Sequence, residues 1–319
     1  MTNTEDPAGW KHYRSPLRFN GKRITLLSTL RVHPSGRWKS HSPLIYTGIS
    51  ILALLVYSQC NKLYSFVTHI FISQYRFPYV VSLTFAQVVL TLVTMVTLHA
   101  VGAIKLHPYS LHLGERLLVP SICDSIQAVL ELWAHINAPS GLYPLTLCLL
   151  PLTCVGWTHG LGLKPYLSIK TTFVLAAVTF TSVTIIGAHD VLWTEPLVSL
   201  YAPLSLFLHS LSLCWLAKLG RMERRLKGHR VSALDLYYCL TVNRSLVLGF
   251  LCLLHPDSPR VLSEGCWHCL LFLAYLLAIL LLGALQHFLL ALTTLYCSPV
   301  AAGILHTTQD LVQTFTSLL

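Results

Sequence analysis

Apolar stretches long enough to cross a bilayer recur along the chain from about residue 44 to its end. A membrane-spanning helix needs about 17 to 25 predominantly apolar residues, and nine runs of the chain meet this condition. We expect spans near residues 44–71, 79–104, 117–137, 142–160, 167–188, 194–217, 233–254, 267–294 and 299–319. The pattern therefore predicts an all-α polytopic membrane protein with nine transmembrane helices.

The basic residues between these runs are distributed unevenly, and their distribution orients the chain. Of the 22 lysines and arginines, 18 lie in the N-terminal tail and in or beside the loops after the second, fourth and sixth runs. The opposite segments hold only Arg76 and Arg260. Cytosolic segments of membrane proteins carry an excess of basic residues. We therefore expect residues 1–42 to form a basic, disordered cytosolic tail and residues 43–319 to form the transmembrane domain.

The composition agrees with this assignment and excludes several classes of protein. Hydrophobic residues make up 54% of the chain and charged residues only 11%, whereas soluble domains carry about 25% charged residues. The net charge is +10, but the basic residues lie between apolar runs and not along one face, so a lipid bilayer is the expected partner and nucleic acid is not. The ten cysteines lie mostly inside apolar runs, where a thiol behaves as a small hydrophobe.

Lys62 is one of two cations that fall inside expected spans, and two placements are open for it. The stretch from Leu44 to Ser73 has 30 residues, about 45 Å of helix, which is too long for one untilted crossing. If the span covers residues 52–73, Lys62 lies near its middle, on nearly the same face as His69. If the span covers residues 44–61, Lys62 is an interfacial anchor that extends to the membrane surface.

Arg244 is the second cation, and polar residues of the third run accompany it. A guanidinium at this depth could bind a phosphate or pair with Asp190 or Asp310. Asp124, Gln127 and Glu131 follow the spacing i, i+3, i+7, which places them along one face of a helix. This face either lines the interior of the bundle or forms a path for protons or substrate.

No motif of the chain predicts an enzyme, a cofactor or a metal site. Cys266 and Cys269 have the Cys-x-x-Cys spacing and enclose His268, but a structural zinc site needs four ligands and no second pair follows nearby. No nucleophile–base arrangement accompanies His189 and Asp190, and no hydrolase signature occurs elsewhere. We expect a protein that is not an enzyme and that binds neither metal nor cofactor.

Four stretches of the chain resemble a known family of transporters. They are ISQYRFPYVVSLTFAQ, which ends at Gln87, GAHD at 187–190, LDLYYCLTVN at 234–243, and the segment from Gly283 that contains HTTQD. These stretches resemble the nucleotide-sugar transporters of solute carrier family 35, within the drug/metabolite transporter superfamily. The D-type branch, which carries UDP-sugars, is the most similar.

The resemblance implies a fold, an activity and a set of site residues. The fold would be a ten-helix transporter of two inverted repeats, here residues 43–190 and 191–319, with the last helix of the second repeat missing. The activity would be exchange of a UDP-sugar for a nucleoside monophosphate across the Golgi or endoplasmic-reticulum membrane. The substrate-binding residues would be Lys62, His69, Gln87, Gln127, Tyr237, Tyr238, Arg244, Gln309 and Asp310.

The chain departs from the family pattern at positions where the family carries cations. The family's Lys-Asn pair becomes Gln309-Asp310, and its glycine nearby becomes His306. Its basic pair, which follows a Leu-Pro-Met stretch in the fourth span, falls near Leu149 and Leu150. A nucleotide diphosphate needs cationic partners in a low-dielectric cavity. The departures favour an alternative, a non-transporting relative that acts as an interaction or trafficking partner. The sequence leaves self-association open.

Overall fold

The computed structural model describes residues 43–75, 77, 79–137, 142–163, 168–190, 196–225, 231–256 and 258–307. Its helices are α1 (Pro43–Tyr75), α2 (Val80–Ala100), α3 (Leu111–Asn137), α4 (Leu142–Leu147), α5 (Leu150–Gly160), α6 (Ile169–Asp190), α7 (Pro196–Arg225), α8 (Ala233–Leu254), α9 (Ser258–Glu264) and α10 (Leu270–Tyr296). Residues 299–307 form a further helical segment, and the described residues contain no strand.

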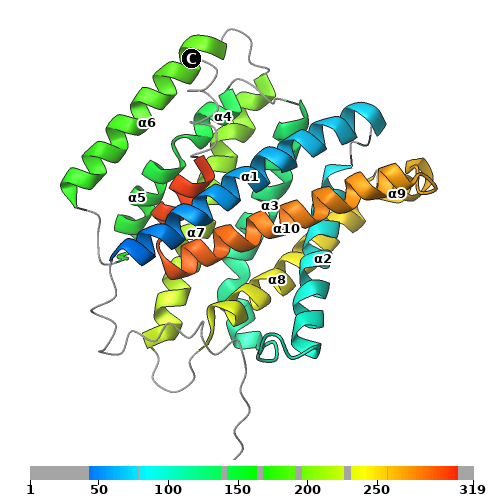
Figure 1. Cartoon of the computed structure of the whole chain (residues 1–319), viewed down its shortest axis with the longest axis horizontal. Coiled ribbons are helices and arrows are strands. Elements are labelled where there is room, and N and C mark those ends of the chain that lie inside the picture. The colour runs from blue at the N-terminus through cyan, green and yellow to red at the C-terminus, as the bar shows by residue number, and fades with distance from the viewer. Residues whose placement is uncertain are drawn as a thin grey trace, which may run out of the picture. The chain divides into compact units, whose positions relative to one another are not determined.

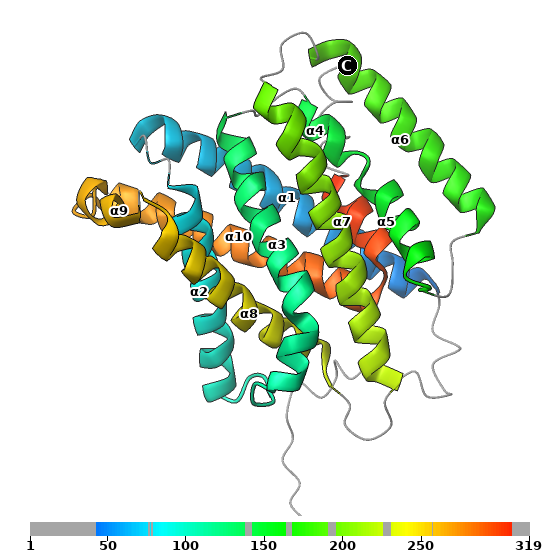
Figure 2. The same ribbon diagram turned by 180° about the vertical axis from the view of Figure 1, so that it is seen from behind.

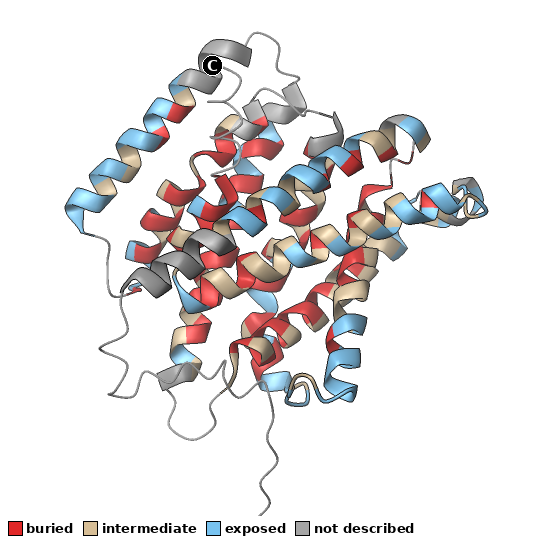
Figure 3. Ribbon diagram, in the orientation of Figure 1, coloured by how far each residue is buried: buried red, intermediate tan, exposed pale blue. Residues whose placement is uncertain are grey.

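Five helical segments among the described residues are long and apolar enough to cross a membrane. They are Val80–Ala100, Leu111–Ala134, Leu200–Glu223, Ala233–Leu254 and Leu270–Tyr296. Their outward faces carry large exposed apolar side chains, among them Phe250 at 62% and Leu270 at 82% exposure. Figure 3 shows exposed residues along the outer faces of α1, α2, α6 and α10. A water-soluble protein does not normally expose apolar surface on this scale, so the helices fit an all-α, multi-pass membrane protein.

The finer prediction of nine spans and an inverted repeat stays a prediction, and one expected span differs in the structure. The run expected as one span over 142–160 is divided into α4 and α5 by a turn at Cys148 and Leu149. Pro151 stands in the first turn of α5, where its missing N–H is tolerated. A proline there cannot continue the hydrogen-bond ladder of a preceding helix. The expected ninth span, 299–319, lies partly outside the described residues.

Two helices begin or end beyond the apolar runs that predicted them. The third helix begins at Leu111 and not near 117, and α7 continues to Arg225 and not only to 217. Arg116 Nη1 lies 2.8 Å from Glu223 Oε1, in the two extensions. Apolar content cannot reveal these extra turns, because polar contacts between the helix ends stabilise them.

The helices surround an interior to which α3, α7, α8 and α10 all contribute. The most extensive packing joins α3 to both α7 and α8, and α1 to α10. In Figure 1, α1 and α10 lie side by side toward the viewer, and Figure 2 shows α3, α7 and α8 from the opposite side. Aromatic residues close the contact between the end of α1 and the start of α10, where the rings of Phe71 and Phe272 lie 5.2 Å apart.

Candidate functional site

Ionisable side chains from several helices meet in the interior of the bundle. They form a group that we call the buried polar cluster: Asp124 and Glu131 of α3, His209 of α7, Arg244 of α8, His287 of α10 and His306 of segment 299–307. Such residues are expensive inside a membrane and usually mark functional positions or pair with one another. The cluster is therefore the strongest candidate for a functional site among the described residues.

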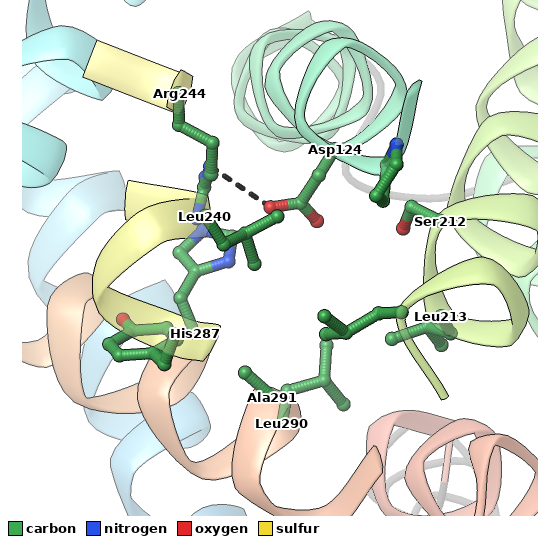
Figure 4. Close-up of a pocket in the computed structure, with 11 residues that line it drawn as sticks. Asp124, Ser212, Leu213, Leu240, Arg244, His287, Leu290 and Ala291 are labelled. Atoms are coloured by element: carbon green, nitrogen blue, oxygen red, sulfur yellow. Dashed lines mark ion pairs between the residues drawn. The ribbon is translucent and has the colours of Figure 1, made fainter. Parts of the chain in front are cut away.

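Arg244 and Asp124 form one end of the cluster. Arg244 is only 2% exposed, and its Nε lies 2.9 Å from Asp124 Oδ2. Figure 4 shows the two side chains pointing toward each other at the edge of a pocket. The ion pair offsets the cost of burying either charge alone. Nε and Nη2 of Arg244 nevertheless make no hydrogen bond of good geometry with the described residues, so this guanidinium retains donor capacity.

The pocket beside this ion pair is small and mostly apolar. Leu213, Leu290 and Ala291 lie across the pocket from the charged pair (Figure 4). His287 and Tyr237 also line it. Its cavity volume is about 20 Å³, which is room for about one water molecule. In this conformation the pocket is too small for any larger solute.

Glu131, His209 and His306 form the other end of the cluster. His306 Nε2 lies 3.3 Å from Glu131 Oε1, and the rings of His209 and His306 meet edge to face at 4.8 Å. Gln127 Nε2 donates a hydrogen bond of 2.6 Å to Glu131 Oε2. His209 is 1% exposed, and neither of its ring nitrogens has a hydrogen-bond partner among the described residues. This end therefore contains a buried imidazole whose polar atoms remain unsatisfied.

Four of the predicted site residues lie in or near the interior, but they do not share one role. Arg244 and Tyr237 line the pocket, whereas Gln127 orients Glu131. Gln87 is buried elsewhere, between α1 and α10, where it donates to the hydroxyl of Tyr64 and the carbonyl of Ile279. Tyr238, a fifth predicted residue, is only partly buried and packs against an apolar cluster.

The structure does not bring Lys62 and His69 to the buried polar cluster, and their role in substrate binding stays a prediction. The inward face of α1 carries Tyr57, Tyr64 and Phe71 at intervals of seven residues. Lys62 and His69 are exposed on another face of this helix. The helix continues unbroken from Pro43 to Tyr75, which is long enough for either placement of Lys62 in the membrane, so both stay predictions. Gln309 and Asp310 lie outside the described residues.

The partner predicted for Arg244 differs from the partner that the structure gives. The sequence leaves a phosphate, Asp190 and Asp310 open as partners, whereas the structure shows an ion pair with Asp124. The side chain of Asp190 and the whole of Asp310 lie outside the described part of the chain. Asp124 belongs to the predicted polar face of α3. Pairing that face with α8 requires the tertiary packing of the two helices, which a single sequence does not specify.

The histidines of the cluster were missed as site residues in the sequence. His209 and His287 each lie within an apolar run. An ionisable residue inside a membrane span is energetically costly, so their position in these runs is the feature that could have marked them as site residues. His306 was noted only as a departure from the family pattern. Comparison with protein-family models found no matching family, and comparison with curated proteins found no significant match.

Proposed function

We propose that this chain is a multi-pass membrane transporter that binds an anionic solute at Arg244, with nucleotide sugars as the substrate class. The observation that carries the proposal is the buried guanidinium with unsatisfied donors beside an internal cavity. Arginine suits this role because its planar group binds phosphate oxygens in a bidentate manner. The motif resemblance supports a UDP-sugar exchanged for a nucleoside monophosphate, in a Golgi or endoplasmic-reticulum membrane with the N-terminus in the cytosol.

Asp124 has a defined part in this mechanism. Without substrate, its carboxylate neutralises Arg244 and so reduces the cost of an empty, buried cation. A substrate phosphate would compete with Asp124 for the same guanidinium, and its arrival would weaken the ion pair. Substrate binding is thereby coupled to a rearrangement between α3 and α8, the two helices that carry the pair.

The small volume of the cavity requires that helices separate before a nucleotide sugar can enter. The cavity now has room for about one water molecule. Pro120 lies inside α3 and lines the pocket, and Pro203 lies inside α7. Prolines are common places for helices to bend. We assign the opening movement to α3 and α7, with the described conformation as the occluded state of an alternating-access cycle.

A second candidate function is a non-transporting membrane protein that binds a partner protein. The outward face of α1 favours it, because Gln59, Lys62 and His69 are exposed along this face. A lysine that faces lipid in the middle of a helix is unfavourable, whereas a partner helix with a carboxylate would satisfy it. The closed cavity and the paired Arg244 agree with this function as well.

Uptake into proteoliposomes separates the two candidates. Purified chain is reconstituted, the vesicles are preloaded with a nucleoside monophosphate, and uptake of UDP-, GDP- and CMP-sugars is measured. We expect one sugar nucleotide to be taken up faster when the matching monophosphate is inside. Arg244→Lys keeps the charge but loses the bidentate geometry, and we expect uptake to fall about tenfold or more.

Lys105→Ala is the matched control, because Lys105 is an exposed cation in the loop after α2. Its uptake is expected to equal that of the unmodified chain. The double variant Asp124→Asn, Arg244→Gln removes both charges together. Neither charge is then left buried without its partner, so this variant is expected to keep the fold. Equal uptake by the Arg244→Lys and unmodified proteins would refute the role of Arg244. No uptake of any sugar nucleotide by folded protein would favour the partner-binding function.

A further inference from the structure

Three potential metal ligands from three separate parts of the chain converge at one end of the buried polar cluster. Glu131 comes from α3, His209 from α7 and His306 from segment 299–307. One ligand atom from each lies within 4.8 Å of the corresponding atoms of the other two. Two imidazoles and one carboxylate are a ligand set that zinc uses at sites with an open coordination position.

His209 gives the independent indication that a ligand belongs here. Its side chain is 1% exposed, and both ring nitrogens lack a hydrogen-bond partner among the described residues. An unsatisfied buried polar group costs about 1–3 kcal/mol. The ring packs edge to face on His306, and a ligand atom of His209 lies within 4.8 Å of those of the other two candidate ligands. A cation between the three side chains would satisfy the imidazole that protein groups leave unsatisfied.

The distances fit a metal after a small adjustment. Neighbouring ligands of a tetrahedral zinc ion lie about 3.4 Å apart, given bond lengths of about 2.1 Å. His306 Nε2 and Glu131 Oε1 are already 3.3 Å apart. The remaining separations, all within 4.8 Å, can shorten by rotation of the His209 side chain, because no hydrogen bond holds its ring in place.

The surroundings of Glu131 resemble the outer shell of a metal site. Gln127 donates a hydrogen bond of 2.6 Å to Oε2 of this carboxylate, which leaves Oε1 directed toward His306. Carboxylates that ligate metals are usually held in this way by a second residue. Gln127 is 1% exposed, so the hydrogen bond is shielded from competition by solvent.

We propose that Glu131, His209 and His306 bind a divalent transition-metal cation of the zinc type. Imidazole with one carboxylate favours zinc and its neighbours over magnesium or calcium, which prefer all-oxygen sites. The three ligands leave one position open for water or for a substrate oxygen. The metal links α3, α7 and segment 299–307. This site does not depend on the proposed function, because none of its ligands is Arg244 or its partner Asp124.

Metal content of the purified full chain tests the proposal. The protein in lipid nanodiscs is stripped with a chelator, loaded with zinc chloride, desalted and analysed by mass spectrometry for metal. We expect a single zinc ion per chain, lost in His209→Gln and His306→Gln. Glu131→Gln and Gln127→Ala are each expected to weaken zinc binding about tenfold or more. Zinc is also expected to raise the unfolding temperature of the unmodified chain.

The free cysteines require a control, because Cys266 and Cys269 flank His268 on the surface. All measurements are therefore repeated in a Cys266→Ser, Cys269→Ser background, where the zinc content is expected to be unchanged. His112→Ala removes an exposed histidine of α3 and is expected to retain zinc. Arg244→Lys is expected to retain zinc whether or not it transports, which separates this proposal from the proposed function.

Cobalt substitution adds a test on the unmodified protein, so that misfolding of a variant cannot decide the result. Co²⁺ bound by nitrogen and oxygen ligands gives visible absorption without the charge-transfer bands of thiolate ligands. Each of three results would overturn the proposal. They are thiolate bands in the cobalt spectrum, loss of zinc when Cys266 and Cys269 are replaced by serine, and equal zinc content in the His209→Gln and unmodified proteins. Failure of the unmodified protein to bind zinc would overturn it as well.

Discussion

Arg244 and Asp124 neutralise each other in a part of the protein where neither charge would be stable alone. The arginine is 2% exposed, and its side chain reaches the carboxylate at 2.9 Å. Removing one partner of a buried pair leaves an uncompensated charge and costs about 3–5 kcal/mol, whereas replacing both with apolar residues is often close to neutral. We therefore expect the effects of mutating the two positions separately and together to be strongly non-additive.

Asp124→Leu is expected to lower the free energy of unfolding by about 3 kcal/mol or more, because it leaves the Arg244 guanidinium buried without a counter-charge. The double variant Asp124→Leu, Arg244→Met is expected to recover most of this loss. Denaturant unfolding in detergent micelles measures the free energy of unfolding of the single and of the double variant. Arg116→Ala breaks the more exposed pair with Glu223 and is expected to cost at most about 1 kcal/mol. Additive losses at Asp124 and Arg244 would contradict the account.

Helix α10 approaches α2 at Gly283, and the lack of a side chain there makes the contact with Gln87 close. A Cβ added to Gly283 would collide with the carboxamide of Gln87. That carboxamide donates to the Tyr64 hydroxyl of α1 and to the Ile279 carbonyl of α10. The absence of a side chain at Gly283 therefore makes room for the Gln87 carboxamide, whose hydrogen bonds join α2 to α1 and α10.

Gly283→Ala is expected to destabilise the protein by about 1–3 kcal/mol, since the added methyl group forces Gln87 or the helices to move. Thermal unfolding of the purified chain measures the effect. Gly156→Ala in α5 is the matched control, because an added Cβ there meets nothing within 4 Å and alanine is the better helix former. Combining Gly283→Ala with Gln87→Ala should relieve the collision. Equal unfolding temperatures for the Gly283→Ala and Gly156→Ala proteins would refute the predicted collision at Gly283.

At the scale of the elements, the sequence predicts the apolar helices well and their ends poorly. The expected run 233–254 coincides with α8, because its apolar composition is continuous between a capping serine and the loop that follows. The run 142–160 conceals the break before Pro151, since composition alone does not register a proline that starts a new helix. The pairing of Arg244 with Asp124 depends on how α3 and α8 pack, and the contact of His209 with His306 depends on how α7 packs against segment 299–307. A single sequence does not specify such contacts.

At the scale of the whole molecule, α10 gives a direct test of the proposed topology. Cys266 and Cys269 precede this helix and Cys297 follows it. Cys266 and Cys297 are exposed. If the nine expected spans all cross the membrane and the N-terminus is cytosolic, seven spans precede α10, so that Cys297 faces the cytosol, whereas Cys266 and Cys269 face the lumen.

A membrane-impermeant maleimide added to sealed microsomes is expected to label Cys297 at once, and Cys266 and Cys269 only after permeabilisation. Mass spectrometry of each cysteine gives the readout. A hydrogen bond with the backbone of Phe272 lowers the pKa of the Cys269 thiol. More of it is therefore thiolate at a given pH, and its labelling should persist to lower pH than that of an ordinary cysteine. Labelling of all three cysteines in sealed vesicles would contradict the topology.

We propose above that a buried arginine inside the helical bundle is the binding point of a phosphate-bearing solute. Equilibrium binding of uridine monophosphate to the purified chain, compared between the unmodified protein, Arg244→Lys and Lys105→Ala, measures this claim most directly. We predict saturable binding that weakens about tenfold or more in Arg244→Lys and is unchanged in Lys105→Ala. Binding of equal strength to all three proteins would contradict it.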